Sequence, residues 1–179
     1  MAEVNLKKKL GKSDVGLVVI PDAWYPHTIL DITRQVTEDF ENVCYVTMDK
    51  LYDSLIRDLE ASGADMIKIF FVDCMSKKTM GRVAESNKVA FISSPYAISE
   101  LKSLLTDKLK NGNFDVMIFD SLSTLMTYTQ VLTAVSLVEA VVRASREAGV
   151  KSFFAILEDD AGSPLAKNLS MFVDKSIKL

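Results

Sequence analysis

Residues 114–125 read FDVMIFDSLSTL, and this stretch decides the fold class of the chain. Four apolar residues run from Val116 to Phe119 and end at a carboxylate, Asp120, which is followed by Ser-Leu-Ser. A short, continuously apolar run of this kind is typical of a strand buried on both faces of a parallel sheet. Because such sheets bind ligands at the carboxyl ends of their strands, Asp120 is a candidate functional residue.

Similar apolar runs recur on both sides of this stretch and alternate with segments of helical character. The other predicted strands are residues 16–20, 43–48, 66–73, 89–92 and 152–157, with 171–178 as a last candidate. The predicted helices are residues 28–40, 51–62, 99–111, 131–149 and 163–168. Residues 76–88 are polar and lack apolar periodicity, which predicts an exposed loop or a short helix. The alternation predicts a three-layer α/β/α fold with a mainly parallel central sheet.

The composition fits one globular unit. The chain has 179 residues, 49% hydrophobic and 25% charged, and no linker divides it, so we expect a single domain over residues 1–179. The net charge of -3 argues against binding to nucleic acid or to an anionic membrane. Cys44 and Cys74 lie inside apolar runs without the spacing of a metal site, so we expect buried, reduced thiols. Without a signal-peptide pattern or an apolar stretch of membrane-spanning length, we expect a cytoplasmic protein.

Acidic residues follow four of the predicted strands. They are Asp49, Asp73, Asp120 and the acidic run at residues 158–160. Carboxylates that meet at one sheet edge can hold Mg²⁺ through its water shell. They can equally cap the N-termini of helices or lie in solvated loops, and in that interpretation Asp120 caps the turn that follows it.

The stretch at residues 114–125 resembles the Walker B strand of RecA/KaiC-like ATPases, an apolar strand that ends in aspartate. The resemblance implies a RecA-like core in which Asp120 takes the position of the aspartate that helps to hold Mg²⁺. Residues 97–111 resemble the helix that leads into this strand, and residues 43–49 resemble the second strand of the family. That strand ends in the catalytic glutamate in active members, and Asp49 stands at this position. Its shorter side chain would reach less far toward an attacking water, so we assign no catalytic residue.

Residues 21–28 depart from the family pattern at the phosphate-binding loop. Aligned on Thr28, they read PDAWYPHT where the P-loop motif reads GxxxxGK[ST]. Pro21 and Pro26 occupy the glycine positions, and His27 occupies the lysine position. Proline has no N–H to donate and cannot adopt the glycine conformations of a phosphate nest, and the acidic residue after Pro21 would repel phosphate. These changes remove donors, backbone freedom and positive charge together.

Thr28 and Asp120 are then all that remains of the nucleotide and Mg²⁺ positions. We expect no cofactor and no metal site; ATP with Mg²⁺ is the alternative. His27 is the sole histidine, which excludes multi-histidine metal sites, and we expect it to cap or pack against the first helix. A Ser/His/Asp triad is formally open, although no GxSxG elbow exposes a serine.

Trp24 and Tyr25 form an aromatic cluster where the phosphates would lie. The cluster either plugs the vacated pocket or offers a contact surface, and the sequence favours neither.

Three functions are compatible with these patterns. The first is a non-catalytic RecA/KaiC-like module for signalling or assembly, which binds a partner protein or further copies of itself. The second is a nucleotide-binding ATPase or switch with an unusual loop and an acidic Mg²⁺ crevice. The third, a receiver-like domain, needs an acidic pair where Pro21 and Asp22 stand and a lysine where Glu158 stands. The missing phosphate donors favour the first, because phosphoryl transfer depends on such donors.

Overall fold

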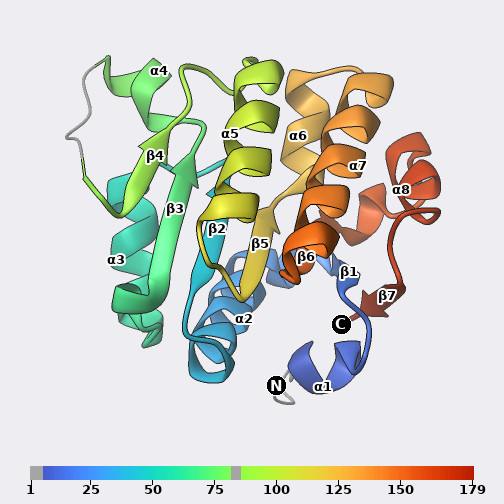
Figure 1. The fold of residues 1–179 in the computed structure, drawn as a ribbon, viewed down its shortest axis with the longest axis horizontal. Helices are drawn as coiled ribbons and strands as arrows, with labels where there is room; N and C mark the ends of the chain where they lie inside the picture. The colour runs from blue at the N-terminus through green and yellow to red at the C-terminus, as the bar shows by residue number, and fades with distance from the viewer. Residues whose placement is uncertain (1–5, 82–85) are drawn as a thin grey trace.

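The computed structural model describes residues 6–81 and 86–179, and its centre is a seven-stranded sheet (Figure 1). The strand order is β4-β3-β2-β5-β6-β1-β7, and every pair of neighbouring strands is parallel. The strands are β1 (Val15–Ile20), β2 (Val43–Thr47), β3 (Ile69–Asp73), β4 (Val89–Phe91), β5 (Val116–Asp120), β6 (Lys151–Leu157) and β7 (Lys175–Lys178). The predicted α/β class with a parallel sheet is confirmed.

Helices follow most of the strands. The α-helices are α1 (Leu6–Leu10), α2 (Tyr25–Asp39), α3 (Tyr52–Ser62), α4 (Ser76–Met80), α5 (Ile98–Asn111), α6 (Leu122–Tyr128), α7 (Val131–Ala148) and α8 (Pro164–Leu169). Three short 3-10 helices are η1 (Asp22–Trp24), η2 (Met66–Lys68) and η3 (Glu158–Asp160). The helix predicted at residues 131–149 ends as expected, because Gly149 adopts a left-handed conformation with φ 70°.

Several boundaries differ from the prediction for local reasons. The first long helix begins at Tyr25 rather than at residue 28, because Pro26 fits the first helical turn, where its missing N–H costs nothing. Residues 66–68 form η2, so β3 is shorter than predicted. Helix α6 was not predicted, since its seven residues are too few to show a helical period. Of the predicted loop at residues 76–88, the first five residues form α4, while 82–85 lie outside the described residues.

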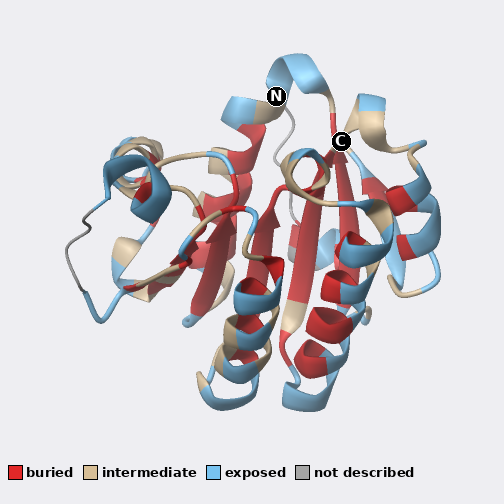
Figure 2. Ribbon diagram, turned by 90° about the horizontal axis from the view of Figure 1, so that it is seen from above, coloured by how far each residue is buried: buried red, intermediate tan, exposed pale blue. Residues whose placement is uncertain are grey.

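Side chains that alternate along the strands build two separate cores. One core lies between the sheet and α5, α6, α7 and α8, and includes Leu17, Val46 and Phe119. The other lies between the sheet and α1, α2 and α3, and includes Val18, Tyr45 and Ile118. Figure 2 shows the central strands buried and the helices buried on their inner faces, while the edge strand β7 is mostly exposed. The chain is therefore a three-layer α/β/α sandwich, in which the α2/α3 face carries the polar residues discussed below.

Both cysteines are buried and free, as predicted. Burial raises the pKa of Cys44 to about 12, so this thiol stays protonated at neutral pH. In the described part of the chain, no helix has both the length and the apolar character needed to cross a lipid bilayer.

Candidate functional site

A row of three polar side chains crosses the carboxyl ends of the central strands. Thr47 on β2 lies in register with Asp73 on β3 and with Asp120 on β5. The exposed fractions are 0% for Thr47 and Asp73 and 5% for Asp120. Each lies two residues after an apolar residue that faces α2 and α3, so the row shares that face and lies beneath the N-terminal ends of these helices.

The carboxylate of Asp120 is held by two phenols. Tyr25, at the start of α2, donates a hydrogen bond of 2.6 Å from its hydroxyl to Oδ1. Tyr45, two residues before Thr47 on β2, donates one of 2.5 Å to Oδ2. Tyr25 reaches Asp120 across β6, the strand that separates β1 from β5 in the sheet. Each carboxylate oxygen therefore accepts a hydrogen bond from a different element of the fold.

Burial sets the electrostatics of this cluster. It raises the pKa of the Asp120 carboxyl above its ordinary value, and the nearby charge of Asp49 acts in the same direction. The two phenol hydrogen bonds oppose that shift, because they stabilise the ionised carboxylate. Burial, and then the charge of Asp120, raise the pKa values of both Tyr25 and Tyr45 well above normal. Both phenols therefore keep their protons and act as donors at any physiological pH.

The connection from β1 to α2 is short and follows helical geometry. After Ile20 the chain passes through Pro21, the 3-10 helix η1 and directly into α2. The φ angles are -57° at Pro21, -107° at Trp24 and -49° at Tyr25. Among the described residues, positive φ outside glycine occurs only at Asn113, so residues 21–28 contain none of the left-handed positions of a phosphate nest.

The two aromatics of this connection have different environments. Tyr25 is half-buried and turned toward Asp120, as a plug of the crevice would be. Trp24 is 57% exposed and lies at the surface. The adjacent Asp22 anchors the turn, because its Oδ2 accepts a hydrogen bond of 3.2 Å from the N–H of Asp159 in η3. The predicted aromatic cluster is thus divided between an inward and an outward side chain.

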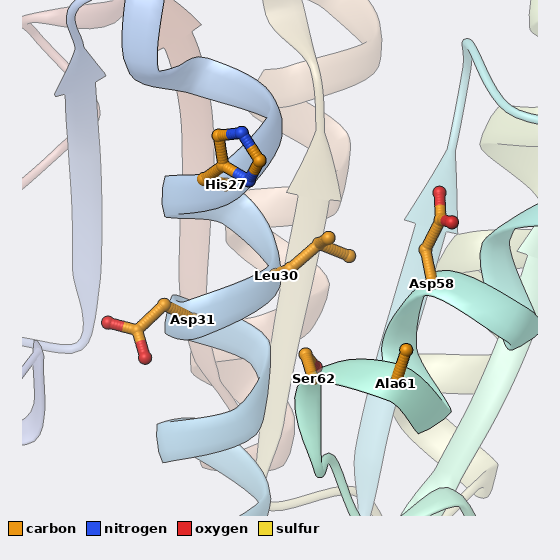
Figure 3. Close-up of a pocket in the computed structure, with 6 residues that line it drawn as sticks. All are labelled: His27, Leu30, Asp31, Asp58, Ala61 and Ser62. Atoms are coloured by element: carbon orange, nitrogen blue, oxygen red, sulfur yellow. The ribbon is translucent and has the colours of Figure 1, made fainter.

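Thr28 and His27 both lie in the first turns of α2. Thr28 is buried at 6% exposure, within the helix rather than in a loop. His27 is exposed and lines an open groove of 320 Å³ between α2 and α3 (Figure 3). Figure 3 shows Asp31 pointing away from this groove, where it pairs with Arg34 at 2.8 Å. The prediction that His27 caps or packs near the helix is wrong, because His27 lies exposed within α2. Among the described residues, no hydrogen bond joins His27 to a serine or a carboxylate, as a triad requires.

The remaining acidic residues have separate roles. Asp49 is exposed, two residues beyond the end of β2. Asp73 accepts hydrogen bonds from the N–H groups of Tyr52, Met75 and Ser76, so it caps the starts of both α3 and α4. For Asp73, the capping interpretation of the acidic strand ends is confirmed. The run at residues 158–160 forms η3, where Glu158 pairs with a lysine of β7.

The serines after Asp120 are structural. Ser121 caps α6, because its side chain accepts a hydrogen bond from the N–H of Thr124 at 3.1 Å. Ser123 accepts one from the N–H of Leu157 at 2.9 Å and so ties α6 to the end of β6. The interpretation of Asp120 as the helix cap is therefore wrong: the cap is one residue later, and Asp120 is free to bind the phenols.

Sequence reasoning missed Tyr45. It is fully buried between apolar neighbours in β2, and a buried phenol needs a hydrogen-bond partner. That need was the available signal, but the partner lies 75 residues away on another strand and follows only from the strand order. Within the described ranges, 6–81 and 86–179, no group of three His, Cys, Asp or Glu side chains is arranged to hold a metal ion.

Comparison with known proteins supports the fold. No protein-family model matches the sequence, and no curated protein matches it. Among solved structures, the chain is similar to a KaiC-like protein of the hyperthermophilic archaeon Pyrococcus horikoshii, with a TM-score of 0.64. The match covers 93% of this chain and 70% of that protein, at 14% sequence identity. The chain has a RecA/KaiC-like fold. At this identity the likeness establishes the architecture, and function must be argued from the site.

Proposed function

We propose that this chain is a non-catalytic RecA/KaiC-like module that works by binding a partner protein. The observation that carries the proposal is the pair of phenols on the Asp120 carboxylate. In an ATP-binding relative this position would face Mg²⁺ and its water. Here Tyr25 and Tyr45 take one carboxylate oxygen each, and Tyr25 occupies the space in front of it.

The geometry of residues 21–28 supports the same conclusion. A phosphate nest needs successive N–H groups that point to one side, which requires alternating right- and left-handed backbone conformations. Pro21 and Pro26 have no N–H, and η1 continues into α2 without a left-handed residue. The side chain of Asp22 would also place a negative charge beside the phosphates. The residues present therefore do not fit ATP with Mg²⁺, and no catalytic step is derived through them.

Trp24 supports a binding role. A tryptophan that is 57% exposed leaves a large apolar surface in water, and such aromatics often supply the main energy of protein interfaces. The turn that carries it is fixed by two prolines and by the Asp22 contact to Asp159. Ordering Trp24 in a complex would therefore cost little conformational entropy.

Titration calorimetry with MgATP tests the non-catalytic half of the proposal. We expect a dissociation constant no tighter than about 1 mM and hydrolysis at the rate of buffer alone. Saturable binding in the micromolar range would refute the proposal and favour the alternative, a nucleotide-binding switch.

Substitution of Trp24 tests the binding half. In the source cells, proximity labelling by the full chain identifies partners, and the affinity of the purified partner is then measured for Trp24→Ala. The matched control is Met171→Ala, since Met171 is 76% exposed on another part of the surface. We expect Trp24→Ala to weaken association by about tenfold or more and the control to leave it unchanged. Equal affinities for the wild type and Trp24→Ala would contradict the assignment of Trp24.

A further inference from the structure

A second surface lies on the opposite face of the sheet, where the N-terminal ends of α5 and α7 meet. The two helices run side by side from the upper edge of the molecule in Figure 1. Between them lies an open groove of 260 Å³, lined by Ile98, Ser99 and Lys102 of α5 and by Leu132, Thr133 and Ser136 of α7. It belongs to a different layer from Trp24, Tyr25 and Asp120.

Exposed apolar side chains line and adjoin this groove. Leu132, in the first turn of α7, is 81% exposed, so its apolar side chain lies in water. Tyr96, two residues before α5, is 59% exposed, and its ring packs edge-on against Tyr128, the last residue of α6. The groove and its rim therefore offer aliphatic and aromatic contact area that the isolated chain leaves uncovered.

The charge around the groove is positive. The ammonium group of Lys102 donates to the neutral hydroxyl of Ser136 at 3.0 Å, and it forms no salt bridge with a described residue. Lys78 lies over the Tyr96 ring, 4.3 Å from its centroid, and likewise has no ion pair within the described segments.

The N-terminal end of α7 adds to this positive field. Neither N-cap residue, Ala97 nor Gln130, caps its helix with a side-chain hydrogen bond. The dipole of α5 is offset by a carboxylate in its first turn, whereas that of α7 is not. Glu100 is the acidic residue in the first turn of α5, and its carboxylate accepts from the N–H and hydroxyl of Ser93. The first turn of α7 contains no acidic residue.

We propose that this groove binds an acidic amphipathic helix of a partner protein. Apolar side chains of that helix would cover Leu132 and Tyr96, while its carboxylates would face Lys102, Lys78 and the N-terminal end of α7. Charge complementarity selects this occupant: a basic helix would meet two lysines and the positive end of α7, and a purely apolar one would leave Lys102 desolvated without a partner. The proposal concerns a surface separate from Trp24 and does not depend on the role proposed for that residue.

Fluorescence anisotropy with two labelled peptides tests this inference on the full chain. Both probes are hydrocarbon-stapled helices with leucine at every third or fourth position; one carries glutamate at the remaining positions and the other carries lysine. We expect the glutamate peptide to bind at least about tenfold more tightly than the lysine peptide, with an affinity that falls as salt rises.

Variants then locate the binding. Leu132→Ser should weaken the glutamate peptide by about tenfold or more, because burial of a leucine side chain is lost. The matched control is Ile67→Ser, since Ile67 is also 81% exposed but lies in η2. Lys102→Gln should weaken binding about threefold to tenfold and flatten its salt dependence, whereas Lys167→Gln on α8 should do neither. Trp24→Ala should leave peptide binding unchanged, which separates this site from the one proposed above.

Several results would overturn the proposal. Equal or tighter binding of the lysine peptide would exclude the charge argument, and no saturable binding of either peptide up to about 1 mM would exclude a docking groove. Glutamate-peptide binding that Leu132→Ser leaves intact would place the site elsewhere. Self-association of the free chain that Leu132→Ser abolishes, measured by sedimentation, would show that a second copy covers the groove instead.

Discussion

Two buried carboxylates, Asp73 and Asp120, flank Thr47 at the carboxyl ends of the strands. Each needs hydrogen-bond donors, and the two obtain them from different parts of the chain. Asp73 accepts from backbone N–H groups at the starts of α3 and α4, all within 21 residues along the chain. Asp120 accepts from the phenols of Tyr25 and Tyr45, which are 95 and 75 residues away. Asp73 caps two nearby helices, whereas Asp120 on β5 is hydrogen-bonded to α2 and β2, which are distant in sequence.

The difference shows how a strand-end acid acquires a role. Asp73 is used as a helix cap, which is favourable in any protein and needs no ligand. Asp120 lies at the carboxyl end of β5, the sheet edge where ligands bind in open parallel sheets, and here two phenols donate to it. The contrast between capping and plugging predicts how substitutions at the two positions will behave.

The largest effect is expected at Asp73. Asp73→Ala removes the acceptor of three backbone N–H groups and of the Ser76 hydroxyl, all at a fully buried position. We expect a loss of about 3 to 4 kcal/mol in the free energy of unfolding, measured by urea denaturation. Asp73→Asn keeps one side-chain acceptor and should lose less. Equal losses would show that the caps contribute little.

Asp120→Ala should cost about 2 to 3 kcal/mol, because it leaves two phenol donors without their acceptor. This is more than the loss of a helix cap, about 1 kcal/mol, would predict. A loss below about 0.5 kcal/mol would mean that the phenols find other acceptors at no cost.

Stability should also depend on pH through Asp120. Its pKa is raised in the folded state, so the fold holds this proton more tightly than the unfolded chain does. The resulting stabilisation is complete below the ordinary pKa of 3.8 and is lost as pH rises through the folded value. Asp120→Asn cannot ionise. The stability of the wild type relative to this variant should therefore fall as pH rises above 3.8, and a difference that rises would contradict the assigned direction.

The two phenols should differ from each other. Tyr45 is fully buried, so Tyr45→Phe leaves one oxygen of Asp120 without a donor and should cost about 1 to 2 kcal/mol. Tyr25 is half-buried, and water can replace its hydroxyl, so Tyr25→Phe should cost about 0.5 to 1 kcal/mol. Both are measured by urea denaturation. If Tyr25→Phe cost more, the crevice would be drier than its exposure indicates.

The smallest effect is expected at Trp24. As an exposed residue, it should change the free energy of unfolding by less than about 0.5 kcal/mol on substitution with alanine. Its fluorescence reports the same property, since it is the sole tryptophan. We expect red-shifted emission that iodide quenches readily in the isolated chain. Blue-shifted, protected emission would make Trp24 a part of the plug together with Tyr25.

The sequence alone determined the class of the fold and the placement of acidic residues at the carboxyl ends of its strands. The short, continuous apolar runs before Asp73 and Asp120 predicted strands that are buried on both faces of a sheet. The helices between the strands predicted parallel pairing, because parallel strands need long crossover connections. The two prolines at residues 21 and 26 predicted that the first connection could not form a phosphate nest, because their restriction acts within single residues.

Tertiary structure alone decided which side chains meet in the crevice. The order of the strands places β6 between β1 and β5 and sets Tyr45 diagonally beside Asp120, and no local pattern encodes that order. It also separated Trp24 from Tyr25: adjacent residues at the start of a helix point in different directions, and only the position of α2 over the sheet determines which one faces Asp120. Contacts between residues far apart in sequence depend on how whole elements pack, which is why the chemistry of Asp120 could not be predicted from the residues around it.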